Sequence, residues 1–95
     1  MFWIYFLYPH SFQQFYIEIV MALTKKEQEF VDKLGKRIVE LRKEANMKQI
    51  ELATRINIED SALRRIESGR TNPTVKTLLE IAAGLDIDIR ELFNF

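Results

Sequence analysis

The run QIELATRINIEDSALRRIESG, residues 49–69, constrains what this chain can fold into more than any other part of it. Leu52 lies on the inner face of a short first helix, and Leu63 and Ile66 repeat at the i, i+3 interval at which a second helix packs. Between them stands Asn57, one of the few residue types that tolerate the positive φ needed for a chain reversal. The run therefore predicts two short helices that are joined by a tight turn and packed against each other.

A longer helix is predicted before this pair, because apolar residues recur there at the 3.6-residue period of an amphipathic helix. These residues are Phe30, Leu34, Ile38 and Leu41. We place the helix at about Thr24 to Ala45, with Thr24 as its N-cap and Glu27 at the capping-box position. Asn46 is expected to end it in the left-handed conformation.

We place the two helices of the pair at about Lys48 to Arg55 and Asp60 to Ser68. Two more helices are predicted after them. Thr74 is the expected N-cap of the fourth helix. Asp88 and Glu91 have the spacing of a capping pair and are expected to open a last short helix. The domain has no stretch with the alternating pattern of a strand, so the sequence predicts an all-α domain of five helices.

With the helices in this register, residues 34–93 resemble the Cro/XRE-type, or phage lambda-repressor-like, helix-turn-helix family of DNA-binding domains. The residues that carry the resemblance are Leu34, Gly35, Leu41, Arg42, Gln49, Leu52, Ala53, Ile66, Glu67, Gly69, Asn72, Pro73, Leu85, Leu92 and Phe93. The resemblance implies a five-helix lambda-repressor-like fold with the helix-turn-helix at helices 2 and 3. It also implies a sequence-specific transcriptional regulator, a dimeric repressor that reads the major groove with helix 3.

The resemblance further implies which residues meet the DNA bases. By position, Asp60, Ser61 and Arg65 match base-facing residues of the family, and Arg64 lies beside them. The Arg65 guanidinium can bond guanine O6 and N7 together, whereas Ser61 can bond to almost any base edge. Asp60, which follows a second acid at Glu59, repels phosphates but can accept a hydrogen bond from the N4 amine of a cytosine. For Arg64, the alternative of a solvated helix face stays open.

Phosphate contacts are expected on both sides of the third helix. The candidate residues are Lys48, Gln49, Arg70, Thr71, Asn72 and Lys76. The resemblance assigns this role to Gln49, and an ordinary polar loop residue is the alternative at each position. The charge distribution favours DNA binding, because residues 33–76 carry a net charge of +5 and residues 77–95 carry −3 within a chain whose formal net charge is zero.

One pair of charges is assigned to stability rather than to DNA. The resemblance places Arg42 of the first helix against Glu67 of the third. We expect this structural ion pair to lock the third helix to the domain, and a partly buried pair of this kind is costly to break.

Residues 1–20 are predicted to be an extension separate from the domain of residues 21–95. They hold eight of the chain's eleven aromatic residues and one charged side chain, Glu18. They lack the basic start and the cleavage site of a secretory signal, and Pro9 breaks the apolar run well before the roughly 20 residues that a membrane span needs. Our leading interpretation is that the natural protein starts at Met21 and that the extension is translated upstream sequence. A membrane-surface anchor and a partner-binding strand are the alternatives.

Composition argues against several classes of function. The chain has no cysteine, and its one histidine, His10, lies outside the predicted domain. A disulfide framework, a histidine metal site and a Ser-His-Asp arrangement are therefore not expected, and we predict no enzyme activity, no metal and no cofactor.

The predicted partners are double-stranded DNA, with a pseudo-palindromic operator, and a second copy of the chain, all in the cytoplasm. Candidates for the dimer surface are Ile87, Ile89, Phe93 and Phe95. The alternative function is an antitoxin or restriction-modification controller that acts partly through a protein partner. A third hypothesis is a membrane-associated regulator that uses residues 1–20.

Overall fold

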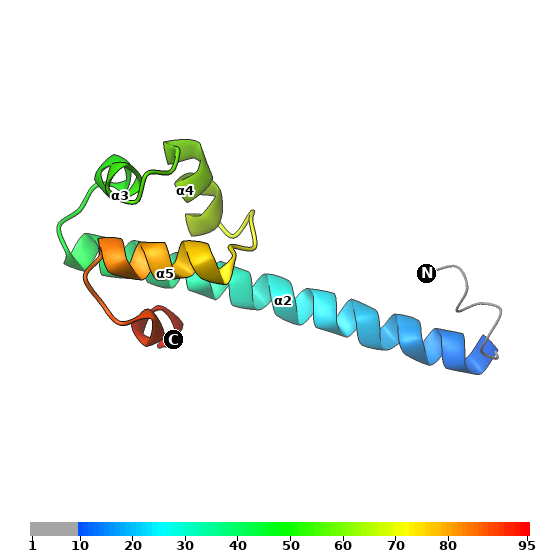
Figure 1. Cartoon of the computed structure of the whole chain (residues 1–95). Helices are drawn as coiled ribbons and strands as arrows, with labels where there is room; N and C mark the ends of the chain where they lie inside the picture. The colour runs from blue at the N-terminus through cyan, green and yellow to red at the C-terminus, as the bar shows by residue number, and fades with distance from the viewer. Residues whose placement is uncertain (1–9) are drawn as a thin grey trace.

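The structure is a computed structural model that describes residues 10–95, and these residues form four α-helices followed by one 3-10 helix (Figure 1). The elements are α2 (His10–Glu44), α3 (Gln49–Arg55), α4 (Asp60–Glu67), α5 (Val75–Gly84) and η1 (Ile89–Phe93). The predicted all-α class is confirmed. The fifth element is a 3-10 helix rather than the short α-helix that the capping pattern indicates.

Helix α2 begins 14 residues earlier than we expected. Thr24 is not an N-cap: it lies inside the helix, and its hydroxyl donates to the carbonyl of Val20 at 2.9 Å. The prediction is wrong because the cap-like sequence at Thr24 competes with an existing helix, and extending a helix by one residue costs far less than starting one. Residues 10–23 contain neither glycine nor proline, so nothing in that stretch interrupts the helix.

The first turns of α2 project from the domain as an arm (Figure 1). The large apolar side chains exposed along the arm are Phe12, Phe15, Ile17, Ile19, Met21 and Leu23. None of the helices among the described residues is long and apolar enough to span a membrane. Residues 1–9 of the predicted extension lie outside the described residues, and residues 10–20 are the start of α2.

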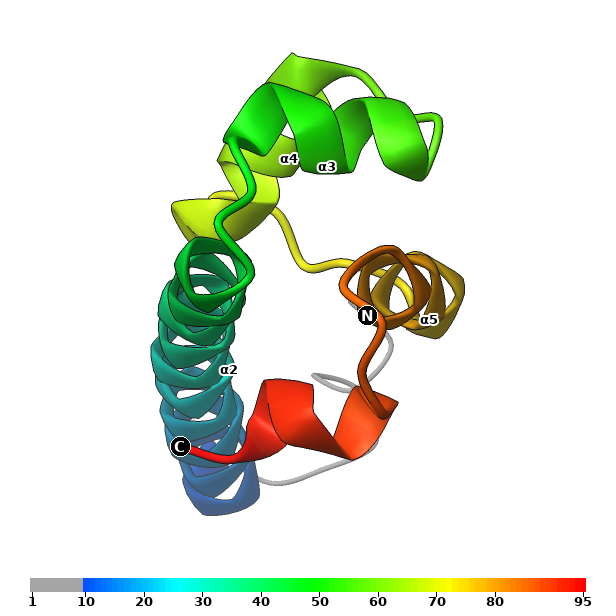
Figure 2. The ribbon, with the colours of Figure 1, turned by 90° about the vertical axis from the view of Figure 1, so that its left-hand side faces the viewer.

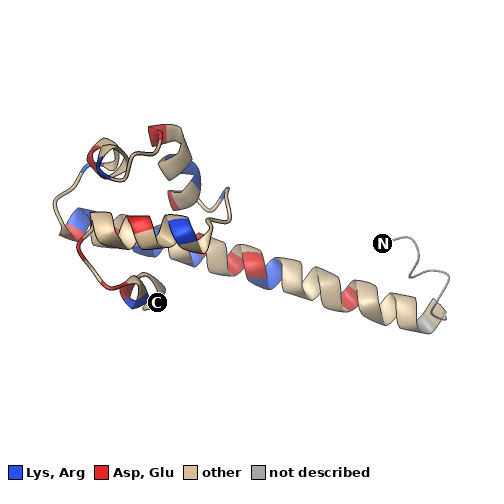
Figure 3. Cartoon of the chain, viewed as in Figure 1, with Lys and Arg blue, Asp and Glu red and all other residues tan. Residues whose placement is uncertain are grey.

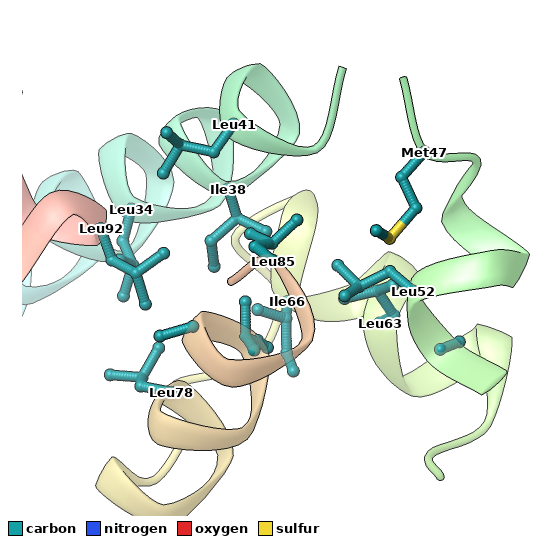
Figure 4. Packing of buried hydrophobic residues seen from close by; sticks show 13 residues of the cluster. Leu34, Ile38, Leu41, Met47, Leu52, Leu63, Ile66, Leu78, Leu85 and Leu92 are labelled. Carbon is teal, nitrogen blue, oxygen red and sulfur yellow. The ribbon is translucent and has the colours of Figure 1, made fainter. Parts of the chain in front are cut away.

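The core lies between the second half of α2 and the four elements that follow it, as the end-on view in Figure 2 and the close-up in Figure 4 show. Each element contributes at least one side chain to it. The largest fully buried side chains are Ile38, Leu52, Leu63, Ile81 and Leu92. Ala53 is 1% exposed in α3, as expected of a small residue where two helices cross closely. The core therefore fixes α4 relative to α2 and α5.

Among residues 10–95, three non-glycine residues adopt a positive φ, and all three follow the end of a helix. They are Asn46, Asn57 and Asp86, with φ of 55°, 58° and 57°. Asparagine and aspartate tolerate this region better than other side chains do. The predicted left-handed conformation of Asn46 and the predicted reversal at Asn57 are confirmed.

Both predicted N-caps after α4 are confirmed, but the predicted capping pair at the second is not completed. Thr74 caps α5 as expected, since its hydroxyl accepts from the Thr77 amide at 3.2 Å. Asp88 caps η1 by accepting from the Arg90 amide at 2.8 Å, and the hydrogen bond from the Arg90 side chain lowers the pKa of Asp88. Glu91 does not complete a capping box, because its carboxylate faces Arg37 of α2 at 3.5 Å.

Candidate nucleic-acid interface

Arg42 and Glu67 form an ion pair in the interior of the domain. The Nε of Arg42 lies 2.8 Å from one carboxylate oxygen of Glu67, and its Nη2 lies 3.1 Å from the other. Both side chains are largely buried, with exposures of 11% for Arg42 and 5% for Glu67. Because Arg42 is on α2 and Glu67 ends α4, the pair ties the C-terminal end of α4 to the long helix.

Gln49 belongs to the same hydrogen-bonded group, which the sequence did not indicate. Its Nε2 donates to a carboxylate oxygen of Glu67 at 2.7 Å, and the carbonyl of Met47 accepts from Nη1 of Arg42 at 2.9 Å. The first residue of α3 is thereby joined directly to α4 and, through Glu67, to Arg42 of α2. One of the two N–H groups of the Gln49 amide is engaged with Glu67, and the second makes no hydrogen bond within residues 10–95.

The candidate base-contacting residues lie along α4, the second helix of the pair. Asp60 and Ser61 are half-buried in its first turn, and Arg64 and Arg65 are exposed further along. Within the described residues, neither guanidinium makes a side-chain hydrogen bond or an ion pair. Figure 3 shows the acidic start of the helix and the basic positions after it. The helix thus presents two exposed guanidinium groups that have no side-chain partner among residues 10–95, and Arg65, two residues before Glu67, lies on the side of the helix away from it.

Ser61 is positioned by a neighbouring acid. Its hydroxyl donates to the carboxylate of Glu59, the N-cap position of α4, at 3.4 Å. Glu59 makes no side-chain cap of its own to the helix. The start of α4 is therefore an acidic and hydroxyl-bearing surface, distinct from the basic surface at Arg64 and Arg65.

The loop between α4 and α5 carries three of the candidate phosphate contacts. Arg70 donates to the Ser68 hydroxyl at 3.0 Å, and Asn72 donates to the carboxylate of Glu27 at 3.0 Å. Thr71 is half-buried between them. The contact between Asn72 and Glu27 was not predicted from the sequence, because Glu27 was assigned to a capping box at the start of a helix.

A shallow cleft brings part of the loop beside α4. It is lined by Ile58, Ala62, Arg65, Ile66, Thr71, Asn72, Pro73, Thr74 and Thr77. One candidate base contact, Arg65, therefore adjoins two candidate phosphate contacts, Thr71 and Asn72. Lys48 precedes α3 and Lys76 is on α5, both exposed and outside this cleft. Lys76 lies 3.9 Å from Glu80 in a loose surface pair.

Comparison with known proteins also identifies a helix-turn-helix in this region. The family model HTH_3, described as helix-turn-helix, matches residues 38–92. The immunity repressor protein of Bacillus phage phi105 is 39% identical over 56 residues, which are 59% of this chain and 39% of that protein. The cryptic phage CTXphi transcriptional repressor RstR of Vibrio cholerae is 37% identical over 60 residues, which are 63% of this chain and 54% of that protein. The chain thus spans about half or less of the length of these two relatives.

Solved structures resemble the domain in the same segment. The restriction-modification controller protein C.AhdI from Aeromonas hydrophila superposes with a TM-score of 0.65 at 35% identity, over 66% of this chain and 96% of that one. A transcriptional regulator of the HTH_3 family from Vibrio cholerae superposes with a TM-score of 0.67 at 27% identity, over 70% of this chain and 38% of that one. The family match begins within α2, so the projecting arm lies outside it.

Proposed function

The chain belongs to the HTH_3 helix-turn-helix family of DNA-binding transcriptional regulators, and from that premise we propose that it is a homodimeric repressor that occupies an operator in the cytoplasm. The observation that carries the proposal is the pair of unengaged guanidinium groups, Arg64 and Arg65, on the exposed side of α4. The C-terminal end of the same helix is held to α2 by the ion pair of Glu67 with Arg42. A helix fixed in this way can enter a major groove as a rigid body.

Base recognition is assigned to four residues of α4. Arg65 bonds guanine O6 and N7, an interaction worth about 1 to 3 kcal/mol of discrimination against the wrong base. Ser61 and Arg64 extend the contact along the groove, and Asp60 accepts from a cytosine amine. The acid costs affinity against phosphates, so its assigned role is to select sequence.

Phosphate contacts set the register of the domain on the duplex. The assigned residues are Lys48, Gln49, Arg70, Thr71, Asn72 and Lys76. Contacts of this kind carry no sequence information but supply much of the affinity, and they make binding fall as salt rises.

The dimer surface is assigned to the exposed aromatic residues at the C-terminal end. Phe93 and Phe95 are 39% and 51% exposed, and both contact Phe30 of α2 with ring centroids 6.0 and 5.2 Å away. Ile87 and Ile89, the other two candidates, pack against the domain's own core and are better explained by it. Such a dimer reads two half-sites about one helical turn, or 34 Å, apart on a pseudo-palindromic operator.

A second function is favoured by the acids Glu59 and Asp60 at the start of the reading helix. These two carboxylates weaken attraction to phosphate, and they suit a surface that acts partly through a protein partner. The structural likeness to a restriction-modification controller supports keeping this alternative beside the repressor.

The test is fluorescence anisotropy of the full chain on the duplex upstream of its own gene and on a scrambled duplex, at two salt concentrations. We expect tight binding to the upstream duplex that falls with salt, and loss of discrimination in Arg65→Ala. Lys36→Ala, which removes one exposed positive charge from α2, is the matched control and should keep the discrimination. Equal, weak binding of both duplexes by the parent chain would contradict an operator upstream of the chain's own gene. It would favour the protein-partner alternative.

A further inference from the structure

Two adjacent side chains of α2 hold the loop that joins α4 to α5. Nε2 of Gln28 donates to the carbonyl of Gly69 at 2.9 Å, at the start of the loop. The carboxylate of Glu27 accepts from Nδ2 of Asn72 at 3.0 Å, three residues further along. Both contacts bridge more than 40 residues of sequence, and both reach a segment that the proposed function assigns to DNA phosphates.

The start of the loop is fixed by more than one contact. Gln28 also donates to the carboxylate of Asp32 at 2.9 Å, so both of its N–H groups are used. Gly69 has a φ of 75° and lies against Asp32, where a β-carbon would collide with that residue's side chain. Gln28 therefore holds the loop against α2 at Gly69, three residues before Asn72.

Glu27 therefore brings a negative charge to a surface that has to approach negatively charged phosphates. Its hydrogen bond with Asn72 joins a charged acceptor to a neutral amide donor, which makes the bond stronger than a neutral one. Bound in this way, the Asn72 amide is less available to a phosphate. The carboxylate itself also repels a phosphate that is brought to the loop, by an amount that salt reduces.

We propose that Glu27 is a positioning residue that lowers the affinity of the domain for DNA backbone by retaining Asn72 and opposing phosphate at this loop. The inference rests on the proposed function. Phosphate contacts do not depend on sequence, so the effect applies equally to operator and to other DNA. Glu27 thereby limits non-specific binding without touching a base.

The test is Glu27→Gln in the full chain, with anisotropy on a mixed-sequence duplex of roughly 30 base pairs, long enough for two half-sites. The amide oxygen of glutamine can still accept from Asn72, so the fold keeps its contact while the charge is lost. We expect binding about two- to fivefold tighter at about 50 mM salt, and a smaller gain at about 200 mM. The melting temperature should not change, which separates this effect from a structural one.

Glu29→Gln is the matched control, because it removes the same charge from an exposed position two residues along the same helix. It should change the affinity less than Glu27→Gln does. An amide oxygen accepts more weakly than a carboxylate, so Glu27→Gln also loosens the hold on Asn72. In an Asn72→Ala background the gain from Glu27→Gln should therefore shrink to the part that comes from the lost charge.

Two results are distinguishable. Unchanged or weaker binding by Glu27→Gln, while the parent chain binds the duplex in a salt-dependent way, overturns the inference and leaves the proposed function standing. A parent chain that shows no salt-dependent binding to any duplex overturns the proposed function instead, and this inference with it.

Discussion

The backbone of Gly35 in α2 lies directly against the carbonyl group of Glu67 in α4. A β-carbon at position 35 would stand 2.6 Å from that oxygen and 2.7 Å from the carbonyl oxygen of Ile66. Both neighbours are backbone atoms at the end of α4, so they cannot move aside as a flexible side chain could. The close crossing of α2 and α4 therefore requires glycine, although this position is in the interior of a helix.

Gly35→Ala should destabilise the domain in spite of alanine's better helix propensity. Alanine gains about 1 kcal/mol in a helix interior, whereas forcing extra volume into a well-packed contact typically costs about 1 to 3 kcal/mol. Here the crowded atoms are backbone, so we expect the cost to win. Denaturant unfolding of this variant and of Lys36→Ala, an exposed neighbour, measures the difference. An unchanged unfolding midpoint for Gly35→Ala would show that α4 can move away from α2.

Glu67→Ala should lower stability before it lowers DNA binding. Removal of this carboxylate leaves the guanidinium of Arg42 and the amide of Gln49 without their shared partner in a largely buried site. Breaking a buried pair by removing one partner costs on the order of 3 kcal/mol or more. Thermal unfolding compared with Glu51→Ala, an exposed acid on α3, provides the measurement. Normal melting together with lost binding would instead place Glu67 at the DNA.

Local features of this fold could be predicted from residue type and spacing, whereas the one long-range contact that we expected, between Arg42 and Glu67, came from the family resemblance. Asn46, Asn57 and Thr74 act within a few residues of themselves, so residue type and spacing were enough to place them. The bond from Gln49 to Glu67 and the bond from Asn72 to Glu27 depend on how the helices pack, and no spacing rule reaches that far.

The start of α2 and the type of helix at η1 show a second limit of prediction from local sequence patterns. The pattern at Thr24 is typical of an N-cap, but the helix that begins at His10 continues through it. The capping pattern at Asp88 correctly places the start of an element. It does not distinguish an α-helix from a 3-10 helix, because both begin with the same unsatisfied N–H groups.

Arg65→Ala and Lys76→Ala should separate base recognition from phosphate contact. The first removes a group assigned to a guanine edge, so it should cost about 1 to 3 kcal/mol on the operator and relax specificity at one base pair. The second should weaken binding to all duplexes alike and reduce the slope of log affinity against log salt by about one. Titration of each variant on operator and scrambled duplexes at several salt concentrations distinguishes them. Equal losses on both duplexes for Arg65→Ala would reassign that residue to the phosphates.

Removal of residues 1–20 should leave the domain's stability almost unchanged. The described core begins at Val31, and the family match begins at Ile38, so the arm adds nothing to either. A chain from Met21 keeps Glu27 and Gln28 and their contacts with the loop after α4. We expect its free energy of unfolding to lie within about 0.5 kcal/mol of the parent, because every buried apolar side chain of the described core is kept.

The same truncation should lower the tendency of the chain to associate with copies of itself. Phe12, Phe15 and Ile19, which the truncation removes, expose 44%, 58% and 43% of their surface along the arm, and contiguous exposed apolar surface promotes association. Sedimentation of the parent and of the chain from Met21 tests this, with a Phe15→Ser, Ile19→Ser variant of the parent as the control that keeps the arm's length. If only the truncated chain remains a single species that binds the operator, the interpretation that the natural protein starts at Met21 gains support. If truncation instead abolishes operator binding while the fold is retained, the arm belongs to the functional dimer and that interpretation is wrong.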